Sequence, residues 1–175
     1  MWRIFSLAIL ALIPVGRVGA QDKRSLIVEV LQTAGDYGDI YRFVPSVAPL
    51  KEKYRISDRY GYRTHPISGE RQFHAGLDMA AVYAATVHAA ASGTVTFAGE
   101  TPGYGKTVVV THRFGFQTRY AHLTLIYTLK GAKVEKGDVI GFVGSTGIST
   151  GNHLHYEVIK NQKRINPLNF IYGTK

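Results

Sequence analysis

The chain has 175 residues, 45% of them hydrophobic, which is enough to bury the core of one domain without cross-links. Its 21 lysines and arginines against 12 acidic residues give a net charge of +9. This charge favours anionic surroundings, but the basic residues are scattered, so we expect no nucleic-acid partner. There is no cysteine, which excludes disulfides, lipid attachment on sulfur and thiolate metal ligands.

The first 20 residues have the pattern of a secretory signal peptide. Arg3 precedes an apolar run from 4 to 15, and small residues lead to the expected cleavage after Ala20. An uncleaved anchor is the alternative, but the run is shorter than the ~20 residues that span a bilayer. Loss of Arg3 and Arg17 would leave 19 basic and 12 acidic residues, a charge of +7. We expect export to the periplasm, the cell wall or the extracellular space, without stable membrane insertion after cleavage.

Residues 21–53 are expected to form an N-terminal extension and linker. A short apolar stretch is followed by the proline-bounded segment 45–49, which indicates extended chain. Whether this extension caps the domain that follows or occupies its groove stays open. Tyr37, Asp39 and Tyr41 are expected at the surface rather than at a metal site.

From Tyr54 onward the chain consists of short β-rich runs separated by glycine-containing turns. The stretch HRFGF, between two of these runs, indicates a hairpin, and no amphipathic stretch of helical period appears. We therefore predict an all-β fold, an antiparallel sheet, sandwich or barrel. The predicted strands are 93–99, 106–112, 116–123, 138–144 and 153–159.

Two of the seven histidines stand one residue apart in the last predicted strand. Because strand side chains alternate between faces, His153 and His155 would share one face. His74 and Asp78 are four residues apart, a spacing that puts them on one face of either a helix or a strand. With His122, these residues offer four imidazoles and one carboxylate.

Such a set matches the chemistry of a catalytic zinc ion. Zinc takes three ligands from His and Asp or Glu and keeps a fourth position for water. A hydrolytic site also needs a group beyond the ligands to accept the proton of that water and pass it to the leaving amine. The set exceeds three ligands, and the surplus is what a hydrolytic site requires. A hydrogen-bonded structural role remains the alternative for any one histidine.

The stretches HAGLDMAA, YAHL and GSTGISTGNHLHYEV resemble the signatures of the lysostaphin-type, or LytM-like, zinc endopeptidases that cut peptidoglycan cross-bridges and stem peptides. The resemblance covers residues 54–171 and implies that they form a zinc endopeptidase domain. It also implies a groove-forming antiparallel β-sheet, similar to a hybrid barrel, with one Zn²⁺ per chain and peptidoglycan as the partner. We expect a monomer.

Residue by residue, the resemblance implies that His74, Asp78 and His155 are the zinc ligands. It makes His122 and His153 the catalytic pair, which accepts the proton of the attacking water and protonates the leaving nitrogen or stabilises the oxyanion. The division of these duties between the two histidines stays open.

Further residues are expected around this centre. Glu157 shares the face of the paired histidines and is expected to accept an imidazole N–H, an exposed glutamate being the alternative. Tyr62, Arg63 and Tyr104 are expected to contact substrate, and glycine-rich loops at 99–105 and 144–151 to wall the groove. The remaining histidines are expected to be structural: His65, His88 and His112.

Two other function classes compete with a peptidase. A regulatory module on the same fold would lack part of the ligand set, whereas all five positions are present here. The stretch GAKVEKGDVIGFVGSTG (131–147) resembles a biotinyl or lipoyl carrier, but Lys133 and Lys136 lack the flanking residues of a modified lysine. The bond cut stays open between Gly–Gly, a D-Ala–diamino-acid cross-link and another peptide.

Overall fold

The computed structural model describes residues 40–64 and 69–171. The predicted signal peptide, the first part of the extension, Tyr37, Asp39 and His65 lie outside the described residues. Within the described ranges, no helix is long and apolar enough to cross a membrane.

Strands make up nearly all of the regular structure, as the all-β prediction requires. A short helix precedes them and a 3-10 turn follows them. In chain order the elements are α2 (Ile40–Phe43), β1 (Arg55–Asp58), β2 (Gly61–Thr64), β3 (Arg71–His74), β4 (Leu77–Ala80), β5 (Thr86–His88), β6 (Gly93–Thr101), β7 (Gly105–Thr111), β8 (Phe116–Ile126), β9 (Lys133–Val134), β10 (Val139–Val143), β11 (His153–Lys160), β12 (Lys163–Ile165) and η2 (Pro167–Asn169).

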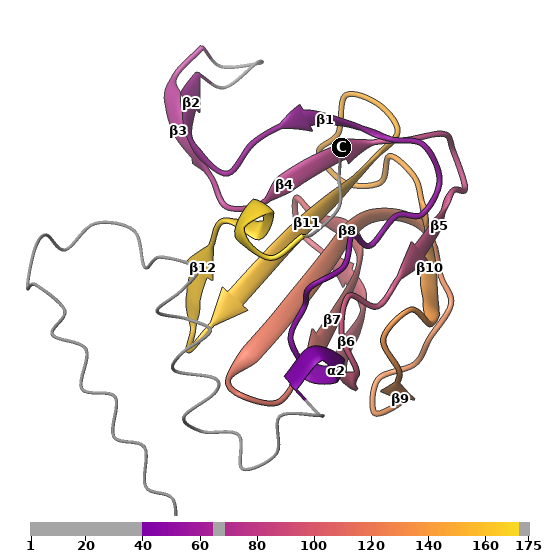
Figure 1. The fold of residues 1–175 in the computed structure, drawn as a ribbon. Helices are drawn as coiled ribbons and strands as arrows, with labels where there is room; N and C mark the ends of the chain where they lie inside the picture. The colour runs from indigo at the N-terminus through magenta and orange to yellow at the C-terminus, as the bar shows by residue number, and fades with distance from the viewer. Residues whose placement is uncertain (1–39, 65–68, 172–175) are drawn as a thin grey trace, which may run out of the picture.

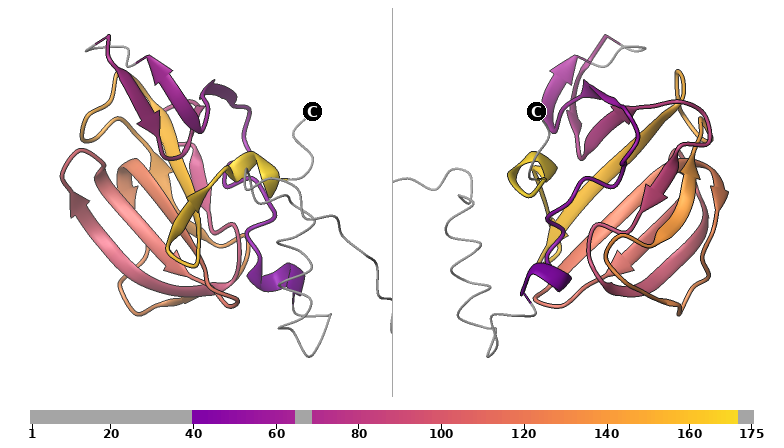
Figure 2. Two further views of the ribbon diagram at one scale, coloured as in Figure 1. Left: turned by 90° about the vertical axis from the view of Figure 1, so that its left-hand side faces the viewer. Right: turned by 45° about the vertical axis from the view of Figure 1, so that its right-hand side comes forward.

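One large antiparallel sheet carries the fold. Its main path runs β1-β4-β11-β8-β7-β6-β9, with β10 joining β5 to β8 and β12 pairing with β11. In Figure 1, β11 lies between β4 and β8. Figure 2 shows that the sheet is strongly curved and that the separate β2–β3 hairpin stands out from its upper edge.

The core lies on one face of the curved sheet because strand residues alternate between faces. In β4, Leu77 and Met79 are fully buried, whereas Asp78 and Ala80 between and after them are partly exposed. In β11 the alternate residues enter the core, where each large apolar side chain stabilises the fold by roughly 1.5–3 kcal/mol. These core residues of β11 are Leu154, Tyr156 and Val158.

The longest strand, β8, changes its pairing partner at His122. Up to Ala121 it pairs with β11, and from Leu123 it pairs with β10. His122 itself adopts a left-handed backbone conformation, with φ of 61°. Non-glycine residues take this conformation rarely and at a cost of order 1–3 kcal/mol, so the surrounding pairing must enforce it.

The five predicted strands are all present, with ends that differ by a few residues. The predicted loop 99–105 is shorter than expected, because β6 continues to Thr101. The HRFGF hairpin is confirmed: Phe114 and Gly115 have φ of 58° and 71°, and the turn joins β7 to β8. The strands before residue 93 had no sequence-based prediction, since they are only 3 or 4 residues long.

The described part of the N-terminal extension packs against the side of the sheet formed by β5 and the turn that precedes β10. The carbonyl of Pro49 accepts a hydrogen bond from the amide of His88, and Arg42 pairs with Glu135. Lys136 donates to the carbonyl of Tyr41, which is 75% exposed. Helix α2 lies at the opposite end of the molecule from the β2–β3 hairpin (Figure 1).

His112 is one of the expected structural histidines, and its surroundings make stability depend on pH. Its Nδ1–H donates to the carbonyl of Ser92 (2.9 Å), and its Nε2 lies 2.8 Å from the hydroxyl of Thr118. Burial lowers the pKa of His112 from 6.5 to about 4. Between these values the unfolded chain binds a proton that the folded chain does not, so stability falls as pH falls from 6.5 towards 4.

We expect His112→Gln to remove this part of the pH dependence. The wild type should lose up to about 1.4 kcal/mol of unfolding free energy per pH unit more than the variant in this window. Urea denaturation at pH 7, 6 and 5 measures the difference. Parallel stability curves for the two proteins would show that His112 does not titrate differently on folding.

Candidate metal centre and active site

Three strands bring His74, Asp78 and His155 together. His74 ends β3, the chain turns through Ala75 and Gly76, and Asp78 is the second residue of β4. Asp78 pairs directly with His155 across the β4–β11 ladder. His74 and Asp78 therefore come together because the chain bends between two strands, and not because both lie on one face of a single element.

The ligand atoms of these residues converge on one point. His155 Nδ1 lies 2.7 Å from Asp78 Oδ1 and 3.1 Å from His74 Nε2, and His74 Nε2 lies 3.2 Å from Asp78 Oδ1. All three side chains are largely buried. Ligands of a tetrahedral zinc ion stand about 3.3 Å apart, so the donor set fits such an ion with little movement. Among the described residues, these three form the one such cluster of potential metal ligands.

Hydrogen bonds on the far side of each imidazole favour metal binding. His74 Nδ1–H donates to the carbonyl of Arg59 (3.0 Å), which leaves the lone pair of Nε2 facing the cluster. His155 Nε2 lies 3.3 Å from Glu157 Oε1, which leaves Nδ1 facing it. Burial by itself would raise the pKa of Asp78, but the two adjacent imidazoles hold that pKa well below its ordinary value. The centre thus offers two nitrogen donors and one ionised carboxylate.

Glu157 anchors His155 from a fully buried position. Tyr104 donates its hydroxyl proton to Glu157 Oε1 (2.8 Å), and guanidinium nitrogens of Arg119 and Arg164 each lie 3.2 Å from Oε2. Burial acts to raise the pKa of Glu157, but the hydrogen bond to His155 and the positive charge of Arg119 lower it to about 2. Glu157 therefore lies where the strand alternation predicted, and it is buried rather than exposed.

His122 and His153 lie side by side next to the three ligands. Their ring centroids are 4.7 Å apart, and His153 Nε2 lies 3.9 Å from Asp78 Oδ2. His122 Nδ1–H donates to the carbonyl of Thr146 (2.7 Å), and His153 Nδ1–H donates to that of Gly151 (2.8 Å). Both rings therefore keep Nε2 as the free acceptor. Burial lowers the pKa of His122 to about 4, so this imidazole is neutral at pH 7.

One loop, residues 144–152, holds both of these rings through contacts that the sequence alone does not predict. Thr146 Oγ1 also accepts from the amide of Lys106 (3.0 Å) and donates to the carbonyl of Leu123 (2.8 Å). Ser149 Oγ lies 3.2 Å from His153 Nδ1 and donates to the carbonyl of Gly151. The serine and threonine content of GSTGISTGN is the available sequence signal for such a network.

A groove of about 830 Å³ passes over these five residues. Arg63 and Tyr104, which are expected to contact substrate, line it, but Arg63 is paired with Asp58, and the hydroxyl of Tyr104 is held by Glu157. Tyr62 does not line the groove: it is 69% exposed and stacks on Phe73, which does line it. The groove walls include Gly103 and the loop residues 148–152, in the two loops that the sequence indicated.

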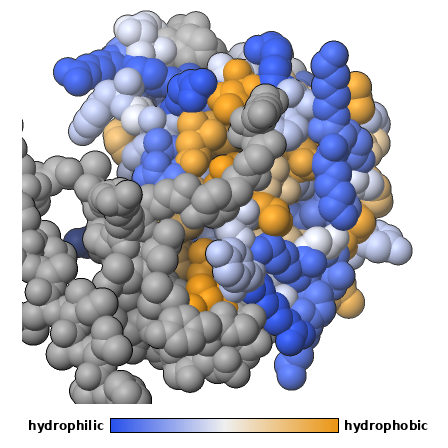
Figure 3. Space-filling view, viewed as in Figure 1, coloured by the Kyte–Doolittle hydropathy of each residue, from blue (hydrophilic) through white to orange (hydrophobic). Residues whose placement is uncertain are grey.

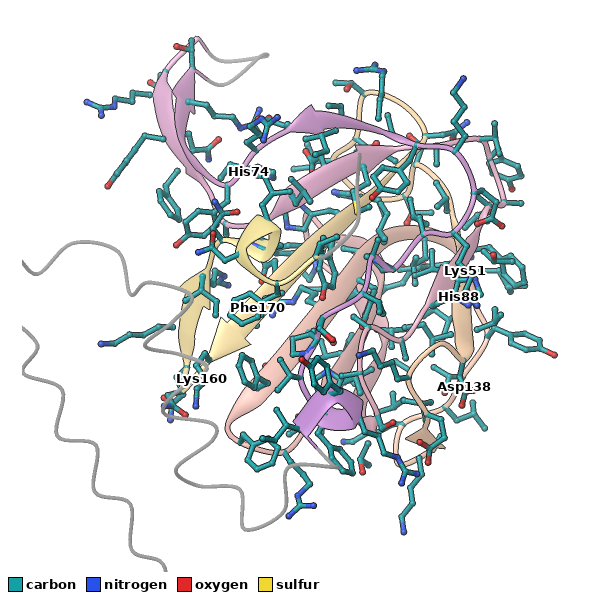
Figure 4. The ribbon with its side chains drawn as sticks, in the orientation of Figure 1. Lys51, His74, His88, Asp138, Lys160 and Phe170 are labelled. Carbon is teal, nitrogen blue, oxygen red and sulfur yellow. The ribbon has the colours of Figure 1, made fainter. Side chains whose placement is uncertain are left out.

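His88 and His112, the other histidines that the structure describes, lie away from the groove. His88 bonds to Thr86 Oγ1 (2.9 Å) and to the carbonyl of Gly137 (2.8 Å), and Figure 4 shows it on a different part of the molecule from His74. His112 lies in the core, as described above. Residues 40–53 contribute nothing to the groove lining, so the described part of the extension caps the sheet.

Gly76 makes room for the imidazole of His155. A Cβ at this position would lie 2.7 Å from His155 Cε1 and 2.7 Å from the backbone carbonyl of Tyr156. Because the carbonyl belongs to the β11 ladder, relieving both contacts would displace the ring and also strain that ladder. The glycine in HAGLD is therefore a requirement of the site, although its importance could not be derived from the sequence alone.

We expect Gly76→Ala to weaken zinc binding about 10- to 100-fold, because the displaced His155 would lose its bond to Glu157. Competition with a chromophoric chelator measures this affinity. Gly99→Ala is the control, since its Cβ would make only an ordinary 3.4 Å contact. Equal zinc affinities for the two variants would contradict the steric argument.

Comparison with known proteins identifies the family. Residues 72–167 match the model of peptidase family M23. The DD-carboxypeptidase/endopeptidase Mpg of Neisseria meningitidis is 48% identical over 120 residues, covering 69% of this chain and 28% of that protein. The peptidoglycan DD-endopeptidase ShyA of Vibrio cholerae is 37% identical over 121 residues, with the same two coverages. The chain thus spans less than a third of the length of these relatives.

Solved structures agree. A zinc-containing peptidase from Vibrio cholerae has a TM-score of 0.65 and 32% identity, over 73% of this chain and 39% of that one. The catalytic domain of lysostaphin from Staphylococcus simulans has a TM-score of 0.63 and 29% identity, over 69% of this chain and 93% of that one. The expected antiparallel fold and the resemblance are both confirmed: the chain belongs to peptidase family M23.

Proposed function

We propose that this chain is a zinc-dependent endopeptidase that hydrolyses peptide bonds in peptidoglycan stem peptides or cross-bridges. The observation that carries the proposal is the presence, in one groove, of three converging metal-ligand side chains and two further imidazoles whose acceptor nitrogens are free. Family membership and relatives named as DD-endopeptidases support it.

In this proposal one Zn²⁺ per chain is held by His74 Nε2, Asp78 Oδ1 and His155 Nδ1. Two neutral imidazoles and one carboxylate leave the ion a net positive charge. When bound, zinc supplies Lewis-acid chemistry, polarising a carbonyl group and lowering the pKa of a water molecule.

His122 and His153 are proposed to handle the proton. Each imidazole has its Nδ1–H tied to a backbone carbonyl, so each can accept a proton only at Nε2. One ring takes the proton from the attacking water, and the other stabilises the oxyanion or protonates the leaving nitrogen. Asp78 Oδ2, 3.9 Å from His153 Nε2, would stabilise the imidazolium form of His153.

Other side chains are proposed to position these groups and the substrate. Glu157 orients His155 through Nε2. The ring of Tyr104 lines the groove while its hydroxyl donates a hydrogen bond to Glu157. Arg63 also lines the groove, with its guanidinium paired to Asp58. Tyr62 would contact only a substrate that extends beyond the groove along the β2–β3 hairpin. In Figure 3, hydrophilic residues of the described part of this hairpin lie at the upper left, which suits a polar polymer.

The remaining assignments follow from the sequence and the family. Residues 1–20 are proposed to be a signal peptide, 21–53 an extension and linker, and 54–171 the endopeptidase domain. The protein would act as an exported monomer in the periplasm, the cell wall or outside the cell. The +7 charge after cleavage suits an anionic wall polymer.

Digestion of purified muropeptides by the zinc-loaded and the metal-stripped protein tests the proposed activity. We expect cleavage at one bond with zinc and none without it, and mass spectrometry of the products identifies the bond. Zinc binding without cleavage of any wall peptide would instead support a regulatory module.

Two histidines on the same strand provide the matched controls. We expect His153→Ala to lower kcat about 10²- to 10⁴-fold while zinc stays bound, because it removes a proton-transfer group. His155→Ala should lose the zinc itself. If both variants lost zinc equally, the division of these residues into ligand and proton carrier would be wrong.

The role of Glu157 is tested by Glu157→Gln. We expect zinc affinity to fall about 10- to 100-fold, because a neutral amide is a weaker acceptor for His155 and leaves two arginines unbalanced. Chelator competition measures the affinity, with the exposed Glu100→Gln as the control. Unchanged affinity and turnover would remove Glu157 from the mechanism.

A further inference from the structure

A row of residues crosses the floor of the groove beside the proposed catalytic pair. Arg55 of β1 pairs with Ala80 of β4, and Ala80 pairs on its other side with His153 of β11. Directly paired residues on neighbouring strands project to the same face of a sheet. Arg55 and His153 therefore share the groove face, and both line the groove.

The spacing along this row is short. Neighbouring strands lie about 4.8 Å apart, so the backbones of Arg55 and His153 are about 10 Å apart across one intervening strand. The residue between them, Ala80, also lines the groove and has only a methyl side chain. In this row only a methyl side chain therefore stands between Arg55 and the proposed proton carrier His153.

Arg55 is the unbalanced charge of the groove. It is exposed and makes no ion pair with any residue that the structure describes. The other arginine of the lining, Arg63, is paired with Asp58. The remaining lining carboxylate, Asp78, lies against both ligand imidazoles. Among the described side chains that line the groove, Arg55 is therefore the one arginine without an ion pair, available to a bound ligand with a negative charge near the reacting bond.

Peptidoglycan cross-links differ in whether they carry a negative charge at this place. Where D-Ala is joined to the D-centre of a diamino acid, or to a terminal D-residue, the carbon attached to the leaving nitrogen bears a free carboxylate. Two bonds, of about 1.46 and 1.52 Å, separate that nitrogen from the carboxylate carbon. A Gly–Gly bond within a cross-bridge has no charge at that position.

We propose that Arg55 binds the α-carboxylate of the leaving residue and thereby selects D-Ala–diamino-acid cross-links, or terminal D-residues, over uncharged cross-bridge bonds. A guanidinium binds a carboxylate through two parallel hydrogen bonds, which fixes orientation as well as position. This contact would hold the leaving residue on the β1 side of the centre, in the row of His153. The assignment rests on the proposed peptidase function and narrows its substrate.

Two synthetic stem peptides test the assignment, identical except that the leaving residue carries a free carboxylate or a carboxamide. We expect the full wild-type chain to cleave the carboxylate peptide with a kcat/KM about 10- to 100-fold higher, the range of a charge-assisted hydrogen-bonded pair. Arg55→Gln should lose this preference while cleaving the carboxamide peptide as before. Arg55→Lys should keep part of the preference.

Lys53→Gln is the control for net charge. It removes one positive charge two residues away, from an exposed side chain that does not line the groove. This variant should keep the wild-type preference. Equal cleavage of both peptides by the wild type, or an equal loss on both peptides in Arg55→Gln, would overturn the proposal.

Equilibrium binding separates this proposal from the peptidase function. If neither peptide is cut, calorimetric titration of both peptides into the wild type and Arg55→Gln still tests whether Arg55 binds the carboxylate. Tighter binding of the carboxylate peptide that depends on Arg55 would retain the anion site and reject the peptidase. Equal binding of the two peptides to both proteins would reject the anion site.

Discussion

Strand β11 is hydrogen-bonded along both edges, to β4 and to β8, and the whole site depends on this double pairing. It fixes the register, so that His155 lies opposite Asp78 on one side and Ala121 on the other. A shift by one residue would turn the histidines into the core and the buried apolar residues into the groove. The burial of Leu154, Tyr156 and Val158 therefore also holds the metal ligands in place.

The second constraint is that each buried polar ring has a partner. Backbone carbonyls hold three imidazoles through Nδ1, and Glu157 holds the fourth through Nε2. Each bond decides which nitrogen is left for chemistry, and it does so before any ligand arrives. The cost of orienting these groups is met during folding, as preorganised sites require. Residues outside the histidine set, including Thr146 and Gly151, therefore shape the site through their backbone atoms.

The groove has two kinds of boundary. On one side, the loop 144–152 is tied by Thr146 to β7 and β8 and lies against the proposed proton carriers. On the other side, β1 and the separate β2–β3 hairpin bring two arginines and the ring of Phe73 to the lining, and β1 is paired to the large sheet through β4. The proposed proton carriers thus lie at the paired centre of the sheet, and the groups that would contact the substrate lie at its edge.

The sequence by itself determined the fold class, the five main strands and the set of five residues at the centre, because alternation within β11 and the motif residues are local properties. It also placed Glu157 on the correct face. Tertiary structure decided the rest. Four features depend on contacts between residues far apart in sequence. They are the change of pairing partner of β8 at His122, the shared loop that fixes the tautomers of His122 and His153, the hydrogen bond that engages the hydroxyl of Tyr104, and the position of Tyr62 outside the groove. Short strands such as β1 are formed by their pairing partners, so the row that joins Arg55 to His153 exists only once the sheet is assembled.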